Sequence, residues 1–183
     1  MRVFITGAAG FLGGALARAL TREGAEIHAL SRPTTDRRAL QDVPITWHEG
    51  DITVRESLKG LFHGTEWIVH AAGRRGQTGL PESVYRNVNV DGTRNVMAET
   101  LATGNKLRVL HLSSPGVLGP TGRKPVTEEA AFAPGNPYER SKAAAEQVAL
   151  EFAAKGLPVV IARPGFVYGP GDKHVLGLFR AVQ

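Results

Sequence analysis

The chain has 183 residues, enough for one domain with a sizeable buried core. Hydrophobic residues make up 42% of it and charged residues 21%, as in an ordinary globular protein, and no apolar run approaches the ~20 residues that span a bilayer. The absence of cysteine excludes disulfides, thiolate metal sites and cysteine nucleophiles, and it suits a cytoplasmic protein. The net charge of +5 comes from basic residues that are scattered, apart from short clusters at Arg37-Arg38 and Arg74-Arg75, so we expect no nucleic-acid partner. Because no apolar run is long enough, we expect no membrane partner either. The dispersed histidines predict no metal site.

Short apolar runs alternate with helical stretches along the chain. Strands are expected at 3–5, 27–30, 45–48, 66–70, 107–112 and 158–162. Helices are expected from residue 12 to Gly24, from about 82 to 103 before Gly104, and from Asn136-Pro137 to Gly156. This alternation predicts an α/β fold with a mostly parallel sheet.

A glycine-rich turn follows the first expected strand and opens the first helix. Gly7, Gly10 and Gly13 stand at G-x-x-G-x-x-G spacing. Gly7 can form the tight turn, Gly10 lets the backbone approach a pyrophosphate, and Gly13 allows close helix–strand packing. The N–H groups that begin the helix attract phosphates. The pattern therefore predicts a dinucleotide site, and a purely structural turn is the alternative.

The end of the second strand bears on which nucleotide binds. An acidic residue there would bind the ribose hydroxyls and favour NAD, but the sequence has Ser31-Arg32-Pro33. An arginine can pair with a 2′-phosphate that a carboxylate would repel. We therefore favour NADP. NAD stays open, because Arg32 can also be a solvated loop residue and Asp36 can face the ribose.

A tyrosine and a lysine share one face near the start of the last expected helix. Tyr138 and Lys142 are four residues apart. A phenol has a pKa near ~10, and a nearby ammonium lowers it, so Tyr138 is predicted to be a general acid/base in hydride transfer. A surface tyrosine and a solvated lysine are the alternative.

Two further polar residues are candidates for the same site. Ser114 follows the fifth strand, where a hydroxyl can polarise the reacting oxygen, whereas a capping role is expected more readily of Ser113. Asn89 lies in mid-helix and can bridge the helix backbone, a water and the lysine; a helix-kinking or exposed polar residue is the equal alternative.

These segments together resemble the extended short-chain dehydrogenase/reductase family, also called the NAD-dependent epimerase/dehydratase family. The similar segments are 6–13, 51–52, 70–73, 89–93, 113–119, 138–142 and 163–172, with Leu118 in place of the family's usual tyrosine. The resemblance implies catalytic roles for Asn89, Ser114, Tyr138 and Lys142. Beside Arg32, it implies cofactor contacts from Gly7, Ala9, Gly10, Phe11, Leu12, Gly13, Asp51, Ile52, Ala71, Ala72, Gly73, Ser113, Pro164, Gly165 and Val167.

The resemblance also implies a doubly wound Rossmann domain over residues 1–172. A helical pattern of Val175, Leu178, Phe179 and Val182 runs to the last residue without a stop signal, so we expect 173–183 to begin a C-terminal substrate lobe that is otherwise missing. No leader peptide is expected. The implied function is epimerase/dehydratase-type hydride transfer on a small molecule, for instance a nucleotide-sugar. The alternatives are an NADPH-dependent, dihydroflavonol-like carbonyl reductase and a catalytically silent NADP-binding sensor. A homodimer through the helices bearing Asn89 and Tyr138 is common in such families.

Overall fold

A six-stranded parallel sheet forms the centre of the molecule in the computed structural model, which describes residues 1–77, 79–104, 107–120, 122 and 125–172. The strands are β1 (Arg2–Thr6), β2 (Glu26–Ser31), β3 (Ile45–Glu49), β4 (Trp67–His70), β5 (Arg108–Leu112) and β6 (Val159–Ala162). Their order across the sheet is β3-β2-β1-β4-β5-β6. The chain winds outward from β1 to one edge and then from β4 to the other, which confirms the predicted doubly wound Rossmann fold.

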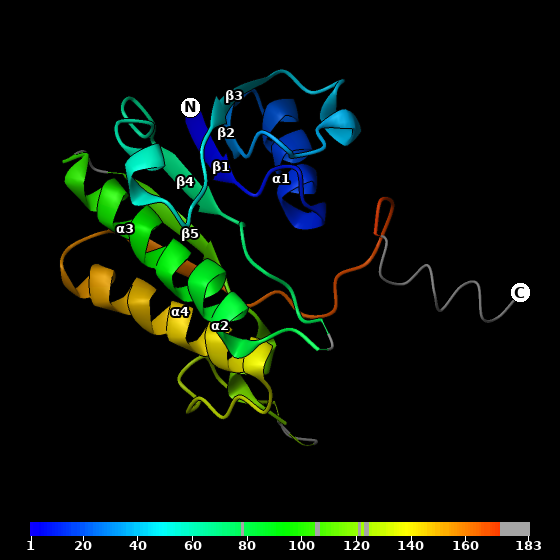
Figure 1. The fold of residues 1–183 in the computed structure, drawn as a ribbon, viewed down its shortest axis with the longest axis vertical. Helices are drawn as coiled ribbons and strands as arrows, with labels where there is room; N and C mark the ends of the chain where they lie inside the picture. The colour runs from blue at the N-terminus through cyan, green and yellow to red at the C-terminus, as the bar shows by residue number, and fades with distance from the viewer. Residues whose placement is uncertain (78, 105–106, 121, 123–124, 173–183) are drawn as a thin grey trace, which may run out of the picture.

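Helices cover both faces of this sheet (Figure 1). The helix α1 (Phe11–Arg22) packs on one face, where Ala17 belongs to the same buried apolar cluster as Val3, Ile5 and Ile27. The helices α3 (Gly92–Ala102) and α4 (Pro137–Ala154) lie side by side on the other face. Because successive strand residues point to opposite faces, each strand contributes to both apolar cores.

The largest difference from the sequence prediction lies in the helix expected over 82–103. It is divided into α2 (Glu82–Tyr85), a π-helix η3 (Arg86–Asp91) and α3. A π-helix leaves carbonyls without their ordinary partners. The Asn89 carbonyl accepts a hydrogen bond from the Thr93 hydroxyl at 2.5 Å, which satisfies it inside the protein.

Shorter segments connect these elements. They are the 3₁₀ turns η1 (Arg38–Leu40), η2 (Arg55–Leu58) and η4 (Pro115–Leu118). Within the described ranges, no helix is both long and apolar enough to cross a membrane. The helix expected from Val175 to Val182 lies outside the described residues.

Candidate active site

The glycine-rich turn brings the backbone of β1 close to that of β4. Gly7 has a φ of +77°, and a Cβ placed on it would lie 2.6 Å from the Ala72 nitrogen. A Cβ on Gly13 would collide with the Gly7 carbonyl. Gly10 precedes α1 and no side chain caps the helix there. The first N–H groups of α1 are thus not covered by a side chain, as a phosphate site requires.

A cleft of about 740 Å³ runs from this turn past the end of β2. Eight of the predicted cofactor residues line it: Gly7, Ala9, Gly10, Arg32, Asp51, Ile52, Ala72 and Gly73. The other eight, which are not part of its lining, are Phe11, Leu12, Gly13, Ala71, Ser113, Pro164, Gly165 and Val167. Further residues that the sequence reasoning missed complete the lining, among them Thr34, Thr53, Arg74, Asn87 and Val88. Asn87 and Val88 immediately precede Asn89 in the sequence, and this adjacency is the one signal from which they could have been predicted.

After the end of β2, the charged residues differ in whether their side chains are paired. Arg38 binds Asp36 through both its backbone N–H and its guanidinium, with distances of 2.7–3.0 Å. The exposed Arg32 side chain makes no hydrogen bond or ion pair with the described residues. Asp36, the carboxylate that could face the ribose, is therefore paired with Arg38, and Arg32 is among the residues that line the cleft.

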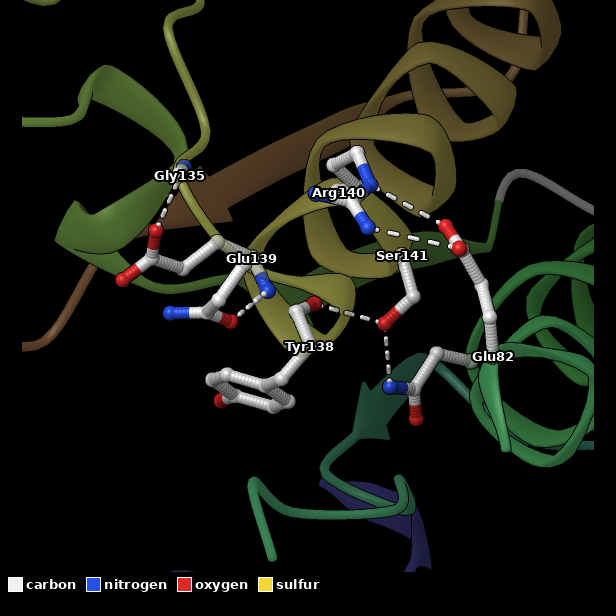
Figure 2. Close-up of polar contacts among 8 residues, drawn as sticks. Glu82, Gly135, Tyr138, Glu139, Arg140 and Ser141 are labelled. Carbon is white, nitrogen blue, oxygen red and sulfur yellow. Dashed lines mark hydrogen bonds and ion pairs between the residues drawn. The ribbon is translucent and has the colours of Figure 1, made fainter. Parts of the chain in front are cut away.

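The first turn of α4 fixes where Tyr138 lies. Asn136 caps the helix by accepting a hydrogen bond from the Glu139 N–H at 2.9 Å, and Glu139 accepts one from the Gly135 N–H at 2.8 Å (Figure 2). Arg140 pairs with Glu82 of α2. Tyr138 projects from this turn, as the predicted Asn-Pro helix start requires.

Asn89 joins the π-helix to α4. Its Oδ1 accepts from the Arg74 N–H at 2.6 Å, and its Nδ2 donates to the Arg74 carbonyl at 2.9 Å and to Ser141 Oγ at 2.8 Å. Ser141 Oγ in turn donates to the Tyr138 carbonyl at 2.6 Å (Figure 2). The buried Asn89 therefore has protein partners for all of these groups, and Ser141 is a partner that sequence reasoning missed.

Lys142 is buried, and its Nζ donates to the Leu112 carbonyl at the end of β5, at 2.6 Å. Burial lowers the pKa of this ammonium to about 8, while the negative charge of Glu146 works in the opposite direction. In the chain without nucleotide or substrate, the expected lowering of the Tyr138 pKa by Lys142 is not seen. Burial raises the pKa of Tyr138, and the effects that oppose this come from a hydrogen bond with Ser114 and the charge of Arg75. The reason is that the ammonium is directed at Leu112.

The capping role that the sequence suggested more readily for Ser113 belongs to Ser114. Ser114 caps η4, where its Oγ accepts from the Gly116 N–H at 3.3 Å. The Ser113 hydroxyl is buried without a hydrogen-bond partner among the described residues. The cap does not remove Ser114 from the site, because a hydroxyl that accepts one bond can still donate another.

The loop after β4 passes over the Tyr138 ring. Tyr85, itself buried, holds the loop by accepting from the Gln77 N–H and donating to the Gln77 carbonyl, both at 2.8 Å. A Cβ on Gly76 would lie 3.5 Å from the Tyr138 ring, so this backbone is in van der Waals range of it. Neither the Tyr85–Gln77 hydrogen bonds nor the position of Arg75 could be predicted from the sequence, because both depend on how the loop after β4 folds back.

Two neutral histidines lie at the ends of β4 and β5. His70 bridges the hydroxyls of Thr6 and Thr93 at 2.7 and 2.9 Å, and its ring is 5.4 Å from that of His111. Burial and the charge of Lys142 lower the pKa of His70 to about 3 and that of His111 well below its ordinary value.

Comparisons with known proteins agree with this arrangement. A protein-family model described as the NAD dependent epimerase/dehydratase family matches residues 3–182. Sterol demethylase protein B of Methylococcus capsulatus is 34% identical over 94% of this chain and 53% of its own length. A 2-alkyl-3-oxoalkanoate reductase of Stenotrophomonas maltophilia is 31% identical over 96% and 54%.

Among solved structures, a double mutant of DesIV, a dTDP-glucose 4,6-dehydratase from Streptomyces venezuelae with NAD bound, is 28% identical over 100% of this chain and 62% of that one, with a TM-score of 0.86. The chain thus spans about half the length of the curated relatives it matches. With the parallel sheet, the glycine turn and the family match in agreement, the chain belongs to the NAD-dependent epimerase/dehydratase family.

Proposed function

We propose that this chain supplies the nucleotide site and the acid/base group of an NAD(P)-dependent oxidoreductase acting on a small-molecule carbonyl or alcohol. The observation that carries the proposal is the placement of Tyr138, Lys142 and Ser114 at the carboxyl edge of the parallel strands, where doubly wound folds bind ligands.

The residues present fit a bound dinucleotide. No side chain covers the backbone at Gly10, and α1 begins there without a side-chain cap. Asp51 keeps its loop in shape by accepting from the Thr53 N–H and hydroxyl at 2.9 Å, and Ile52 lies in the same cleft wall. When bound there, the nicotinamide would supply or accept a hydride.

Tyr138 and its neighbours handle the proton that accompanies this hydride. In the reductive direction, Tyr138 gives its phenolic proton to the substrate oxygen as the hydride reaches the carbon, and it regains a proton from solvent. Ser114 donates a hydrogen bond to the same oxygen. Once nucleotide and substrate are bound, the Lys142 ammonium stabilises by its charge the phenolate that forms during the reaction, and Asn89 holds Tyr138 through Ser141.

NADP is favoured over NAD by the charges at the end of β2. The Arg38 guanidinium forms an ion pair with the Asp36 carboxylate. The Arg32 side chain is therefore the group that we expect to pair with a 2′-phosphate. The similar DesIV structure holds NAD, so NADP selectivity is a proposal specific to this chain.

Carbonyl reduction is the reaction we favour, with a nucleotide-sugar substrate as the second candidate. The curated relatives above include a reductase of 3-oxoalkanoates. The dTDP-glucose 4,6-dehydratase, which is similar over the whole chain, supports the second candidate.

Replacing Tyr138 by Phe tests the mechanism, because it removes the proton donor and keeps the ring. We expect ketone-dependent oxidation of NADPH, measured with 2-methylacetoacetate and cyclohexanone as probes, to fall about 10²–10⁴-fold. Nucleotide affinity should not change. An unaltered rate in the variant would contradict the mechanism, and nucleotide binding without turnover of any carbonyl or nucleotide-sugar would favour the silent sensor.

A further inference from the structure

A buried ion pair lies one helical turn beyond Lys142. Glu146 is only 1% exposed, and Arg163, which directly follows β6, binds both of its carboxylate oxygens. Lys142 and Glu146 are four residues apart in α4, so both side chains project from the same face of the helix. The carboxylate thus pairs with Arg163, and Lys142 lies one helical turn away on the same face of α4.

The protein holds Arg163 in place by several contacts. Its Nη1 donates to the Glu128 carbonyl at 3.1 Å, and its guanidinium lies 5.6 Å from the centre of the Phe132 ring. Stability alone is a weak reason for such a pair, because apolar residues of similar volume often replace buried ion pairs without loss. A role in the neighbouring site is the better explanation.

The surroundings of Lys142 show what that role is. The titratable groups that face it are His70 from β4, His111 from β5 and Glu146 from its own helix. Both histidines are neutral, so Glu146 is the carboxylate that opposes the desolvation of the ammonium. The Glu146 carboxylate is also paired with Arg163, and this pairing limits how far its negative charge can raise the pKa of Lys142.

We propose that Glu146 is a positioning residue for Lys142, whose carboxylate keeps the buried lysine protonated, and that Arg163 sets the strength of this effect. The proposal rests on the function proposed above, in which the Lys142 ammonium stabilises the Tyr138 phenolate. Deprotonation of Lys142 then limits the reaction on the alkaline side.

Opposite shifts of two variants distinguish this role from a structural one. Glu146→Gln keeps the shape and removes the charge, so the alkaline limb of the pH–rate profile should move down by about one pH unit. Arg163→Gln leaves Lys142 as the nearest cation of the carboxylate, so the limb should move up. If the pair is purely structural, both variants should be less stable, and the alkaline limbs of their pH–rate profiles should lie at the same pH.

Two further variants complete the series. Glu146→Asp retains the charge and should keep the limb close to that of the parent chain. Glu151 also lies in α4, and Glu151→Gln breaks its solvent-exposed pair with Arg94 of α3, so it should leave the limb unchanged. Thermal unfolding of each variant shows that the comparison is made on folded protein.

Nuclear magnetic resonance of isotope-labelled lysine gives a second measure that needs no turnover. The Lys142 signal, assigned from a Lys142→Arg variant, should titrate at lower pH in Glu146→Gln and at higher pH in Arg163→Gln. Unshifted titration and an unshifted limb in both variants would overturn the inference while ketone reduction upholds the proposed function. Shifted titration in a chain that reduces no ketone would instead leave the role of Glu146 standing and overturn the proposed function.

Discussion

At the scale of single residues, the buried positive charge of the site is concentrated on Lys142. The buried Lys142 carries an ammonium, while the adjacent His70 and His111 are held neutral by burial and by that ammonium. The two ring nitrogens of His111 have no hydrogen-bond partner among the described residues. This arrangement makes the stability of the fold depend on pH.

The direction of that dependence follows from the two histidines. Below the ordinary pKa of about 6.5, the unfolded chain takes up protons that the folded chain refuses, so stability is greatest above this pH and falls as the pH falls toward 3. Each histidine should contribute about 1.4 kcal/mol per pH unit in this window. Urea unfolding between pH ~7 and ~5 measures the slope.

Replacing His111 by Leu isolates one contribution. The variant should lose about half of the histidine-dependent slope and be at least as stable at pH ~7, because two unpartnered polar atoms are removed. His63→Leu at the surface is the matched control. A slope that is the same in His111→Leu and in the parent chain would contradict neutral burial of this histidine.

At the scale of elements, the start of α4 decides where the acid/base residue lies. Asn136→Ala removes the acceptor for the Glu139 N–H, and we expect it to lower the free energy of unfolding by about 1 kcal/mol. Tyr138 stands in the first turn of that helix, so the rate of ketone reduction should fall with it.

Asn136→Ser provides the control for this change, because its hydroxyl restores an acceptor at the cap. Denaturant unfolding and the ketone assay should both place it near the parent chain. If the Ala and Ser variants were equally impaired, the capping hydrogen bond would not be what positions the helix.

The elements also show which features the sequence could predict. The strands and the ends of α1 and α4 carry local signals, namely apolar runs, Gly24, the Asn-Pro pair and Gly156, and they lie within two residues of the predicted bounds. The π-helix had no specific signal, since residues 86–91 contain two asparagines, two valines and an aspartate, which are poor helix formers but do not specify a π-helix. The motif residues of the site were predictable, whereas the contacts of Ser141, Tyr85 and Arg163 arise only when distant segments meet.

At the scale of the whole molecule, one cleft links the two halves of the sheet. The order changes direction between β1 and β4, and the glycine turn, the end of β2 and the loop after β4 all border the cleft at that point. The central claim is that this cleft binds a dinucleotide and that Arg32 makes it select NADP.

Titration of the chain with NADPH and with NADH, followed by nicotinamide fluorescence, tests this claim most directly. We expect saturable binding of both, tighter for NADPH. Arg32→Gln should weaken NADPH binding by about 10-fold or more and leave NADH unchanged, because a charge-assisted contact to phosphate is lost. Arg37→Gln, at a residue whose guanidinium stacks on Trp47, is the control. Failure of the folded chain to bind either nucleotide would contradict the account, and equal affinities for the two that Arg32→Gln does not alter would contradict the role of Arg32.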